Sequence, residues 1–162
     1  HFTEFDCIPL RRDFYSLLET RLAAEGADVI GCGVEQIDGT NHPHYLYHLS
    51  DPEFTALLQR LSRRAQRDVV LSMLGCFSFW KRDAFLAVAE QNVSLPIYLE
   101  IALPTLAHHL GFRVRGLQDQ DPFIKPRGDF LSELDALRDS GAWMAHPVKG
   151  FWEQLLATDG SP

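Results

Sequence analysis

The sequence predicts a mixed α/β domain in which helices flank a mixed sheet. Two observations carry this prediction. Segments 13–25, 51–66 and 98–110 repeat apolar residues at helical spacing, whereas 28–34 and 68–80 are short apolar segments of the kind that form buried strands. Because such segments alternate along the chain, an α/β arrangement is favoured over an all-helical or an all-β one.

The composition indicates that residues 1–162 form one globular domain or a piece of a larger one. With 46% hydrophobic and 23% charged residues, the chain can bury a core of ordinary size. Its formal net charge of −7 argues against nucleic acid as the main partner, because phosphate binding needs a basic surface. No apolar run approaches the roughly 18 residues that a membrane span requires, and no signal peptide is visible. We therefore expect a cytoplasmic protein without a transmembrane segment, and peripheral contact with a membrane stays open.

Residues 2–10 are expected to form the first strand, because apolar and acidic residues alternate there. In an extended chain this alternation places Glu4 and Asp6 on the same side. Two carboxylates at a strand end are a workable half-site for Mg²⁺ or Mn²⁺, which keep other positions for water and phosphate oxygens. Acidic residues at strand ends are also common without a metal, so the triplet alone leaves both interpretations open.

The first helix is expected at 13–25, where Gly26 provides the end and apolar residues share one face. A buried strand at 28–34 and an amphipathic helix at 51–66 follow. The most apolar segment, 68–80, is expected to be a single central strand.

Gly75, inside that predicted central strand, marks a kink or a place where a ligand comes close. The segment 81–90 then continues as a helix. Buried aromatic residues are the ordinary interpretation of Phe77, Phe79 and Trp80, which could stack on a sugar ring only if they reach a cleft.

The stretch 98–114 is the part around which the rest of the chain is organised. Its leucines recur at the spacing of one helical face, and Gly111 ends that face before 112–114 becomes extended: Leu99, Leu103, Leu106 and Leu110. We therefore expect a helix that leads into a strand.

Pro104 determines where Glu100 lies in this helix. A proline lacks the N–H that would bond the carbonyl of Glu100 four residues back, so it is tolerated best in the first turn. Glu100 is therefore expected at the helix entrance, where a carboxylate suits either a cap or a catalytic group. Spacing alone favours the cap.

The last part of the chain begins with a charged loop at 118–128. Asp119 and Asp121 are close neighbours within this one loop, so we do not assign them as ligands. A short helix starts at Asp129 and is followed by 141–149, where a proline holds His146 extended and Lys149 lies one short step further on. A lone histidine is usually structural or merely exposed, and that interpretation stays open here.

Three of these features occur in the order that they have in GT-A glycosyltransferases, particularly those of the family 2 type. The triplet Glu4-Phe5-Asp6 resembles the Asp-x-Asp motif that holds the metal and the nucleotide diphosphate in that family. Glu100, with a glycine eleven residues on that leads into Phe-Arg-Val, resembles the catalytic base on the acidic-motif helix. His146 looks like the C-terminal histidine that completes the metal site. The resemblance covers nearly the whole chain.

The resemblance implies a fold and an activity. The chain would be the C-terminal metal and acceptor half of a Rossmann-like GT-A domain, with the nucleotide-binding half upstream of His1, so the fragment alone is expected to be inactive. The full protein would transfer a sugar from a nucleotide-diphosphate donor to the hydroxyl of a glycan or other acceptor. Inversion at the anomeric carbon is expected, with Glu100 as the general base. Leu99 stands where the family usually has a second carboxylate.

The resemblance also implies roles for the remaining site residues. A divalent ion, Mn²⁺ or Mg²⁺, would be held by Glu4, Asp6 and His146. Lys149 would neutralise the leaving phosphate as a point charge. The segment just upstream of the acidic-motif helix is similar to the acceptor side of the family's site, which implies acceptor contacts for Trp80, Lys81 and Arg82.

Two other functions remain open. A metal-dependent hydrolase could use the same carboxylates and histidine to activate water, and it would release phosphate or free sugar without an acceptor. A non-catalytic α/β interaction domain is the other alternative, in which Glu100 caps a helix and His146 packs. The distance between Asp6 and His146 in the folded chain separates the second alternative from the two enzymes.

Overall fold

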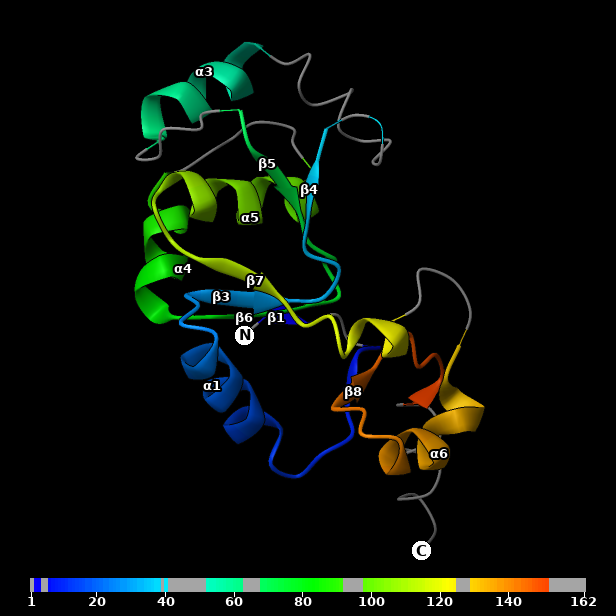
Figure 1. Cartoon of the computed structure of the whole chain (residues 1–162). Helices are drawn as coiled ribbons and strands as arrows, with labels where there is room; N and C mark the ends of the chain where they lie inside the picture. Colours follow the sequence, from blue (N-terminus) through cyan, green and yellow to red (C-terminus); the bar gives the residue numbers. More distant parts are fainter. Residues whose placement is uncertain are drawn as a thin grey trace, which may run out of the picture.

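The computed structural model describes residues 2–3, 6–38, 40, 52–62, 68–91, 98–124 and 129–151. Within these residues the chain forms a mixed α/β fold with five α-helices and three small sheets (Figure 1). The fold class predicted from the sequence is confirmed at this level. None of the described helices is both long and apolar enough to cross a membrane.

The strands are short and the helices span two to three turns. In chain order the elements are β1 (Phe2–Thr3), β2 (Ile8–Pro9), α1 (Phe14–Ala24), β3 (Val29–Gly31), β4 (Glu35–Ile37), α3 (Pro52–Leu61), β5 (Val70–Ser72), β6 (Phe77–Trp80), α4 (Arg82–Ala89), α5 (Leu99–His109), β7 (Val114–Gly116), the 3-10 turns η1 (Asp121–Phe123) and η2 (Leu131–Glu133), α6 (Leu134–Asp139) and β8 (Met144–Ala145).

The main sheet has the strand order β1-β6-β3-β7. Strand β3 is antiparallel to β6 and parallel to β7, with Gly31 opposite both Ser78 and Gly116. The carboxyl ends of β3 and β7 therefore meet at the same edge of the sheet. In open sheets with parallel strands, that edge is where ligands usually bind.

Helices cover both faces of this sheet (Figure 1). Val29 packs into a core cluster with residues of α3, α4 and α5, whereas its neighbour Ile30 packs into a second cluster with Phe14, Leu18 and Leu22 of α1. Successive side chains of a strand point to opposite faces, so Val29 and Ile30 pack into apolar clusters on the two faces of the sheet.

The segment 68–80 is two strands, and the prediction of one central strand is wrong. Strand β5 pairs with β4, while β6 pairs with β1 and β3 in the main sheet. The chain turns between them at Gly75, whose amide bonds to a side chain and not to a neighbouring strand. The predicted first strand, 2–10, divides in the same way, since β1 and β2 belong to different sheets. Strand β4 was not predicted, because only Ile37 of its residues is buried.

Helix α5 is buried on most of its surface, so the predicted leucine face does not describe it well. Leu99 is 66% exposed, whereas Thr105 and His109 are fully buried. The Thr105 hydroxyl bonds the Leu71 amide and carbonyl at 3.0 Å each, and His109 Nε2 lies 2.7 Å from the Val69 carbonyl oxygen. Polar side chains can face the interior here because the backbone of β5 and of the residue before it supplies their partners.

Residues 129–151 form a small lobe beside the main sheet (Figure 1). Strand β2 pairs with β8 in antiparallel register, with Ile8 opposite Ala145. The lobe has its own apolar cluster, which contains Ile8, Phe130, Leu137, Ala142, Ala145 and Val148. The chain therefore returns from its C-terminal part to pair with residues near its beginning.

Candidate active site

Asp6 and His146 lie side by side in the structure. The Asp6 Oδ1 atom is 3.4 Å from His146 Nε2, and each side chain is only 14% exposed. A carboxylate and an imidazole from opposite ends of the described chain are thus brought together in a largely dry place. The resemblance to GT-A glycosyltransferases implied that these two residues would meet.

The pairing of β2 with β8 explains the contact. Continuing the register from Ile8 and Ala145 toward the amino terminus places Asp6 opposite Pro147, the residue after His146. The backbone agrees with this alignment, because the Val148 amide donates to the Asp6 carbonyl at 2.9 Å. The backbone pairing therefore brings Asp6 and His146 to neighbouring positions on adjacent segments.

A second backbone contact holds His146 to the chain after β7. Its amide donates to the Phe123 carbonyl at 3.1 Å, and Ile124 forms a parallel bridge with His146. The His146–Pro147 peptide bond is cis. His146 is therefore held between β2 on one side and the residues after η1 on the other.

The pair fits two of the three ligands predicted for a divalent ion. Ligands of an octahedral ion lie about 2.1 Å from it, so two neighbouring ligand atoms are roughly 3 Å apart. The 3.4 Å separation of Asp6 and His146 is close to that value. Across the described ranges no group of three or more His, Cys, Asp or Glu side chains could hold a metal, and Glu4, the third predicted ligand, lies outside them.

Glu100 lies in the first turn of α5, as the sequence predicted. Its Oε1 atom accepts a hydrogen bond from the Gly75 amide at 2.5 Å. Pro104 lies further inside the helix than the predicted first turn. The close approach that Gly75 was expected to mark is thus the approach of the Glu100 side chain, within the protein itself.

Glu100 also lines a pocket of about 280 Å³ at the carboxyl end of β3. A second carboxylate, that of Asp121, lines the same pocket and accepts a hydrogen bond from the Gly33 amide at 2.9 Å. The complete lining is Gly33, Val34, Glu35, Ser72, Met73, Leu74, Glu100 and Asp121. The pocket lies at the sheet edge where ligands are expected.

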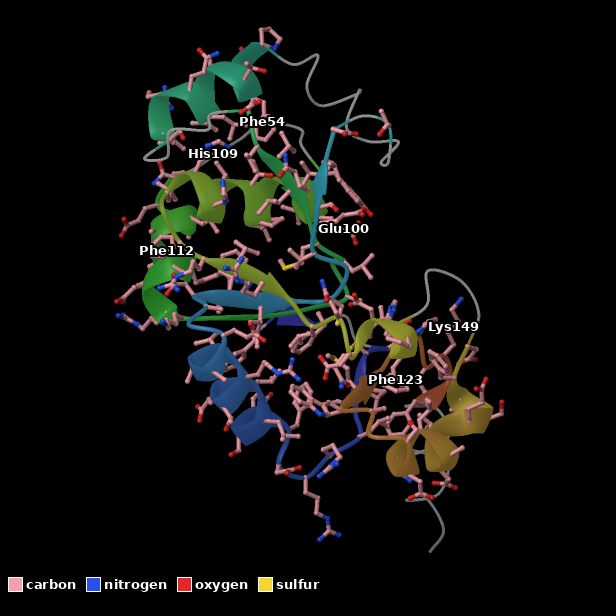
Figure 2. The ribbon with its side chains drawn as sticks, viewed as in Figure 1. Phe54, Glu100, His109, Phe112, Phe123 and Lys149 are labelled. Atoms are coloured by element: carbon pink, nitrogen blue, oxygen red, sulfur yellow. The ribbon has the colours of Figure 1, made fainter. Side chains whose placement is uncertain are left out.

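Asp121 connects the pocket with the Asp6–His146 pair. It begins η1, and Phe123, two residues later, accepts the hydrogen bond from the His146 amide. Figure 2 labels Glu100 on the side of the main body that faces the lobe bearing Phe123 and Lys149. Sequence reasoning set Asp121 aside as part of a charged loop. Its position in the loop that follows β7, beyond the carboxyl end of a parallel strand, is the signal that could have identified it.

Lys149 belongs to the same lobe as His146. It is exposed, and its backbone amide donates to Asp129 Oδ1 at 3.1 Å. Lys149 directly follows Val148, whose amide bonds the Asp6 carbonyl, and its predicted role toward the leaving phosphate stays a prediction.

The predicted acceptor residues lie elsewhere. Trp80 is 7% exposed and donates from Nε1 to the Ser78 hydroxyl at 2.8 Å, while Lys81 pairs with Asp28 at 2.9 Å. Arg82 is exposed at the start of α4. All three lie at the end of β6 opposite to Gly75, so the structure does not bring them to the Glu100 pocket. Their acceptor role stays a prediction.

The three cysteines are free and buried, and they belong to one core cluster. Burial raises the pKa of the Cys32 thiol well above its ordinary value, and Cys76 and Asp121 raise it further. A thiol with a raised pKa stays protonated at neutral pH and is a poor nucleophile. Cys32 is therefore a packing residue behind the pocket and not a catalytic group.

Comparisons of this chain with models of protein families, with curated proteins and with solved structures found no match. The functional argument therefore depends on the residues and their arrangement. That arrangement offers a carboxylate–imidazole pair suited to a divalent ion and, joined to it through η1, a pocket with a carboxylate that can accept a proton.

Proposed function

We propose that this chain is the metal and acceptor half of a GT-A glycosyltransferase. In this proposal the protein transfers a sugar from a nucleotide-diphosphate donor to an acceptor hydroxyl and inverts the anomeric carbon. The Asp6–His146 contact carries the proposal, because the resemblance to GT-A enzymes implies that these two residues meet and nothing in local sequence spacing requires it.

Asp6 and His146, together with Glu4, would hold a Mn²⁺ or Mg²⁺ ion. A carboxylate suits both ions, and an imidazole nitrogen favours the transition metal. When bound, the ion would act as a Lewis acid that offsets the negative charge on the leaving diphosphate. Lys149, exposed in the same lobe, would add a positive point charge for that diphosphate.

Glu100 would act as the general base. Its carboxylate faces the pocket and keeps the oxygen that does not bond Gly75 available to take a proton from the acceptor hydroxyl. The deprotonating oxygen attacks the anomeric carbon from the side opposite to the leaving nucleotide. No protein nucleophile is required, and the transition state has the oxocarbenium character known from glycoside hydrolysis.

The lining of the pocket indicates the charge of the acceptor. Glu35, Glu100 and Asp121 place three carboxylates around it. An anionic acceptor would be repelled there, whereas a neutral glycan with several hydroxyl groups could donate hydrogen bonds to the carboxylates. We therefore propose a neutral, hydroxyl-rich acceptor. The resemblance to GT-A enzymes further leads us to propose a cytoplasmic site of action and a nucleotide-binding segment upstream in the same protein.

The test is a product assay with the full-length protein, a panel of nucleotide sugars and Mn²⁺. The proposal predicts that nucleoside diphosphate is released much faster when a neutral glycan acceptor is added, and that a glycosylated acceptor appears. Release of free sugar at the same rate without an acceptor would instead identify a hydrolase. Neither product with any donor would favour the non-catalytic α/β domain.

A further inference from the structure

The residues after β7 form a segment that joins the main sheet to the C-terminal lobe. We call Leu117–Ile124 the bridge segment. At one end the Leu117 amide donates to the Gly31 carbonyl at 2.8 Å. At the other end Phe123 accepts from the His146 amide, and Ile124 bridges the same residue. The position of His146 relative to the sheet therefore depends on this segment.

Gln120 is the buried polar residue of the bridge segment, with 2% exposure. Its Oε1 atom accepts a hydrogen bond from the Trp143 amide at 2.8 Å, and its Nε2 atom donates to Asp119 Oδ2 at 3.1 Å. Burying an amide is costly unless it is hydrogen-bonded, and here both ends of the amide are bonded. Trp143 directly precedes β8, so Gln120 ties the start of that strand to the bridge segment.

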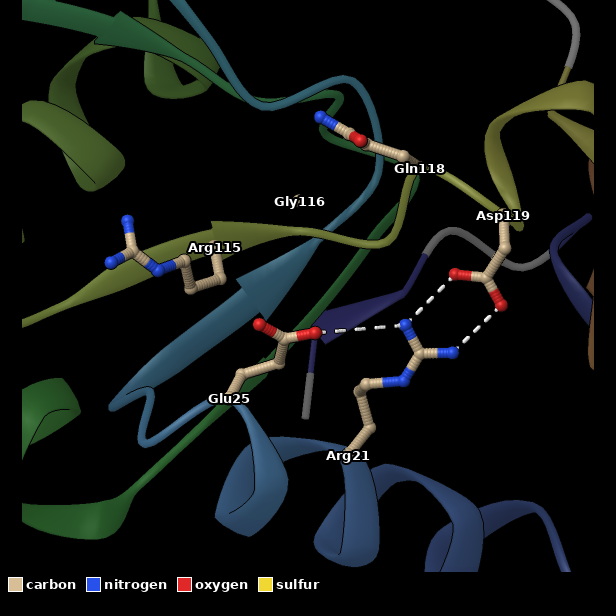
Figure 3. A pocket seen from close by; sticks show the side chains of 6 residues that line it. All are labelled: Arg21, Glu25, Arg115, Gly116, Gln118 and Asp119. Atoms are coloured by element: carbon tan, nitrogen blue, oxygen red, sulfur yellow. Dashed lines mark hydrogen bonds and ion pairs between the residues drawn. The ribbon is translucent and has the colours of Figure 1, made fainter.

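Arg21 of α1 contacts Asp119 (Figure 3) and also lies against the Trp143 ring. Its guanidinium forms two hydrogen bonds with Asp119, at 3.0 and 2.8 Å, and lies 5.1 Å from the centre of the Trp143 ring. A fork of two parallel bonds is the most directional contact that arginine makes with a carboxylate. Arg21, Asp119, Gln120 and Trp143 thus form a closed ring of contacts, with one member on α1, two on the bridge segment and one at the start of β8.

We infer that Gln120, supported by Arg21, is a positioning residue that holds His146 opposite Asp6. Their described contacts lead to the pair through Trp143, which directly precedes β8. The Trp143 carbonyl already accepts from the Leu10 amide at 2.8 Å, which attaches β8 to the strand that follows Asp6. With Gln120 in place, both backbone groups of Trp143 are bonded, one toward β2 and one toward the bridge segment.

Without Gln120, the bond from His146 to Phe123 and the bridge between His146 and Ile124 would still join the two parts, but the Trp143 amide would lose its partner in the bridge segment. The start of β8 could then shift relative to the segment that also carries Asp121, and His146 would shift with it. Residues that orient a metal ligand typically change metal affinity by roughly 10–100-fold when they are lost. This inference rests on the proposed function for the metal, but the position of His146 can be measured without any metal.

The test compares variants of the full-length protein by NMR of the His146 ring and by Mn²⁺ titration. Gln120→Leu keeps the side-chain volume and removes both hydrogen bonds. Arg21→Met removes the fork at a partly exposed position, and Arg21→Lys retains the charge. Arg138→Met is the matched control, because it removes an ion pair of similar length, 2.7 Å to Asp135, within the same lobe.

In metal-free protein we expect the His146 ring signals to shift in Gln120→Leu, to shift less in Arg21→Met, and to return toward wild type in Arg21→Lys. Arg138→Met should leave them unchanged. Wild-type His146 signals in folded Gln120→Leu would overturn the inference. If Gln120→Leu does not fold, the His146 ring signals of Arg21→Met test the inference instead, and wild-type signals in that variant would overturn it.

Mn²⁺ affinity separates this inference from the proposed function. We expect it to fall by roughly 10–100-fold in Gln120→Leu, and more in His146→Ala. If His146→Ala alone lost Mn²⁺ affinity and Gln120→Leu kept wild-type affinity, only the positioning role of Gln120 would be contradicted. Unchanged Mn²⁺ affinity in His146→Ala would contradict the metal site. The NMR signals of His146 in metal-free protein would still decide the role of Gln120.

Discussion

The carbonyl oxygen of Glu100 accepts a hydrogen bond from the Met73 amide at 2.8 Å. This bond is possible because Pro104, four residues on, has no N–H to occupy that carbonyl. The proline therefore frees the entrance of α5 to bond the end of β5. Glu100 is held through both its carbonyl and its carboxylate, which bonds Gly75. Pro104, which was expected in the first turn of the helix, thus leaves the Glu100 carbonyl free to bond Met73 and so helps to hold the candidate base in place.

Glu100→Gln should abolish base catalysis without disturbing the fold. The glutamine side chain keeps an oxygen that can accept from the Gly75 amide, but it cannot take a proton. We expect turnover to fall by a factor on the order of 10²–10⁴, with donor binding and thermal stability close to wild type. Steady-state kinetics of the full-length protein with saturating donor measure this.

Normal turnover in Glu100→Gln would return Glu100 to the role of a structural link between α5 and the Gly75 turn. Glu100→Ala provides the comparison, because it removes the hydrogen bond as well. If both variants lost the same activity, the proton-accepting oxygen would be the important one. If only Glu100→Ala lost activity, the hydrogen bond to Gly75 would be the important feature of Glu100.

Gly75→Ala should displace the Glu100 side chain. A methyl group at Gly75 would lie 3.0 Å from Glu100 Oε1 and 3.2 Å from its Cγ atom, closer than ordinary contacts. We expect a clear fall in turnover with little change in donor affinity, because the carboxylate moves in the pocket. Gly116→Ala is the control, since the nearest atom to its added methyl is 3.5 Å away, in Val34. Equal turnover in the two variants would show that the Glu100 position is not critical.

Gly31→Ala should destabilise the main sheet. The added methyl would lie 2.4 Å from Met73 Sδ and 3.2 Å from the Phe77 carbonyl oxygen. The sulfur can move but the backbone oxygen cannot move easily, so we expect a loss of about 1–3 kcal/mol in the free energy of unfolding, as for other overpacked cores. Urea denaturation followed by circular dichroism measures it. Wild-type stability would mean that Met73 moves aside without cost.

The Asp119 carboxylate should contribute stability that acid removes. Burial alone raises the pKa of Asp119, but hydrogen bonds from Arg21 and Gln120 outweigh burial and lower the pKa below its ordinary value. A carboxylate with a lowered pKa in the folded state stabilises fully above its unfolded pKa of about 3.9 and loses this contribution as the pH falls through the folded value. Protonated Asp119 then resembles asparagine.

The stability difference between wild type and Asp119→Asn should therefore be present at neutral pH and shrink as the pH falls below about 4. Urea midpoints of both proteins at several pH values measure it. Asp135→Asn provides the control, because that side chain is 96% exposed. A difference that stayed constant across this range would contradict the assigned role of the Arg21–Asp119 pair.

The sequence was sufficient for features that depend on local chemistry or on motif order. Apolar spacing predicted helix α1, and Glu100 lies in the first turn of α5 as expected, although Pro104 lies further inside that helix than the prediction assumed. The family resemblance implied the approach of Asp6 to His146, although the β2–β8 pairing that accompanies it was not visible in the sequence.

The remaining features depend on pairing between distant segments, which spacing does not encode. The segment 68–80 was expected to be one strand, because its apolar residues run almost without a break across Gly75. Asp121 reaches the pocket only because β7 pairs in parallel with β3, so that the residues after both strands meet. Gln120 in a polar loop gave no sign that it would be buried, since its partner Trp143 comes from the far end of the described chain.

The binding of Mn²⁺ at Asp6 and His146 tests the account most directly. Free Mn²⁺ can be followed by electron paramagnetic resonance while it is titrated into the full-length protein together with a nucleoside diphosphate. We predict that Asp6→Asn and His146→Ala each weaken Mn²⁺ binding at least ten-fold, as expected for the loss of a ligand or its orientation, whereas Asp135→Asn binds like wild type. Wild-type affinity in both Asp6→Asn and His146→Ala would contradict this account, and the contact of Asp6 with His146 would then be a structural one between the residues that flank β2 and β8.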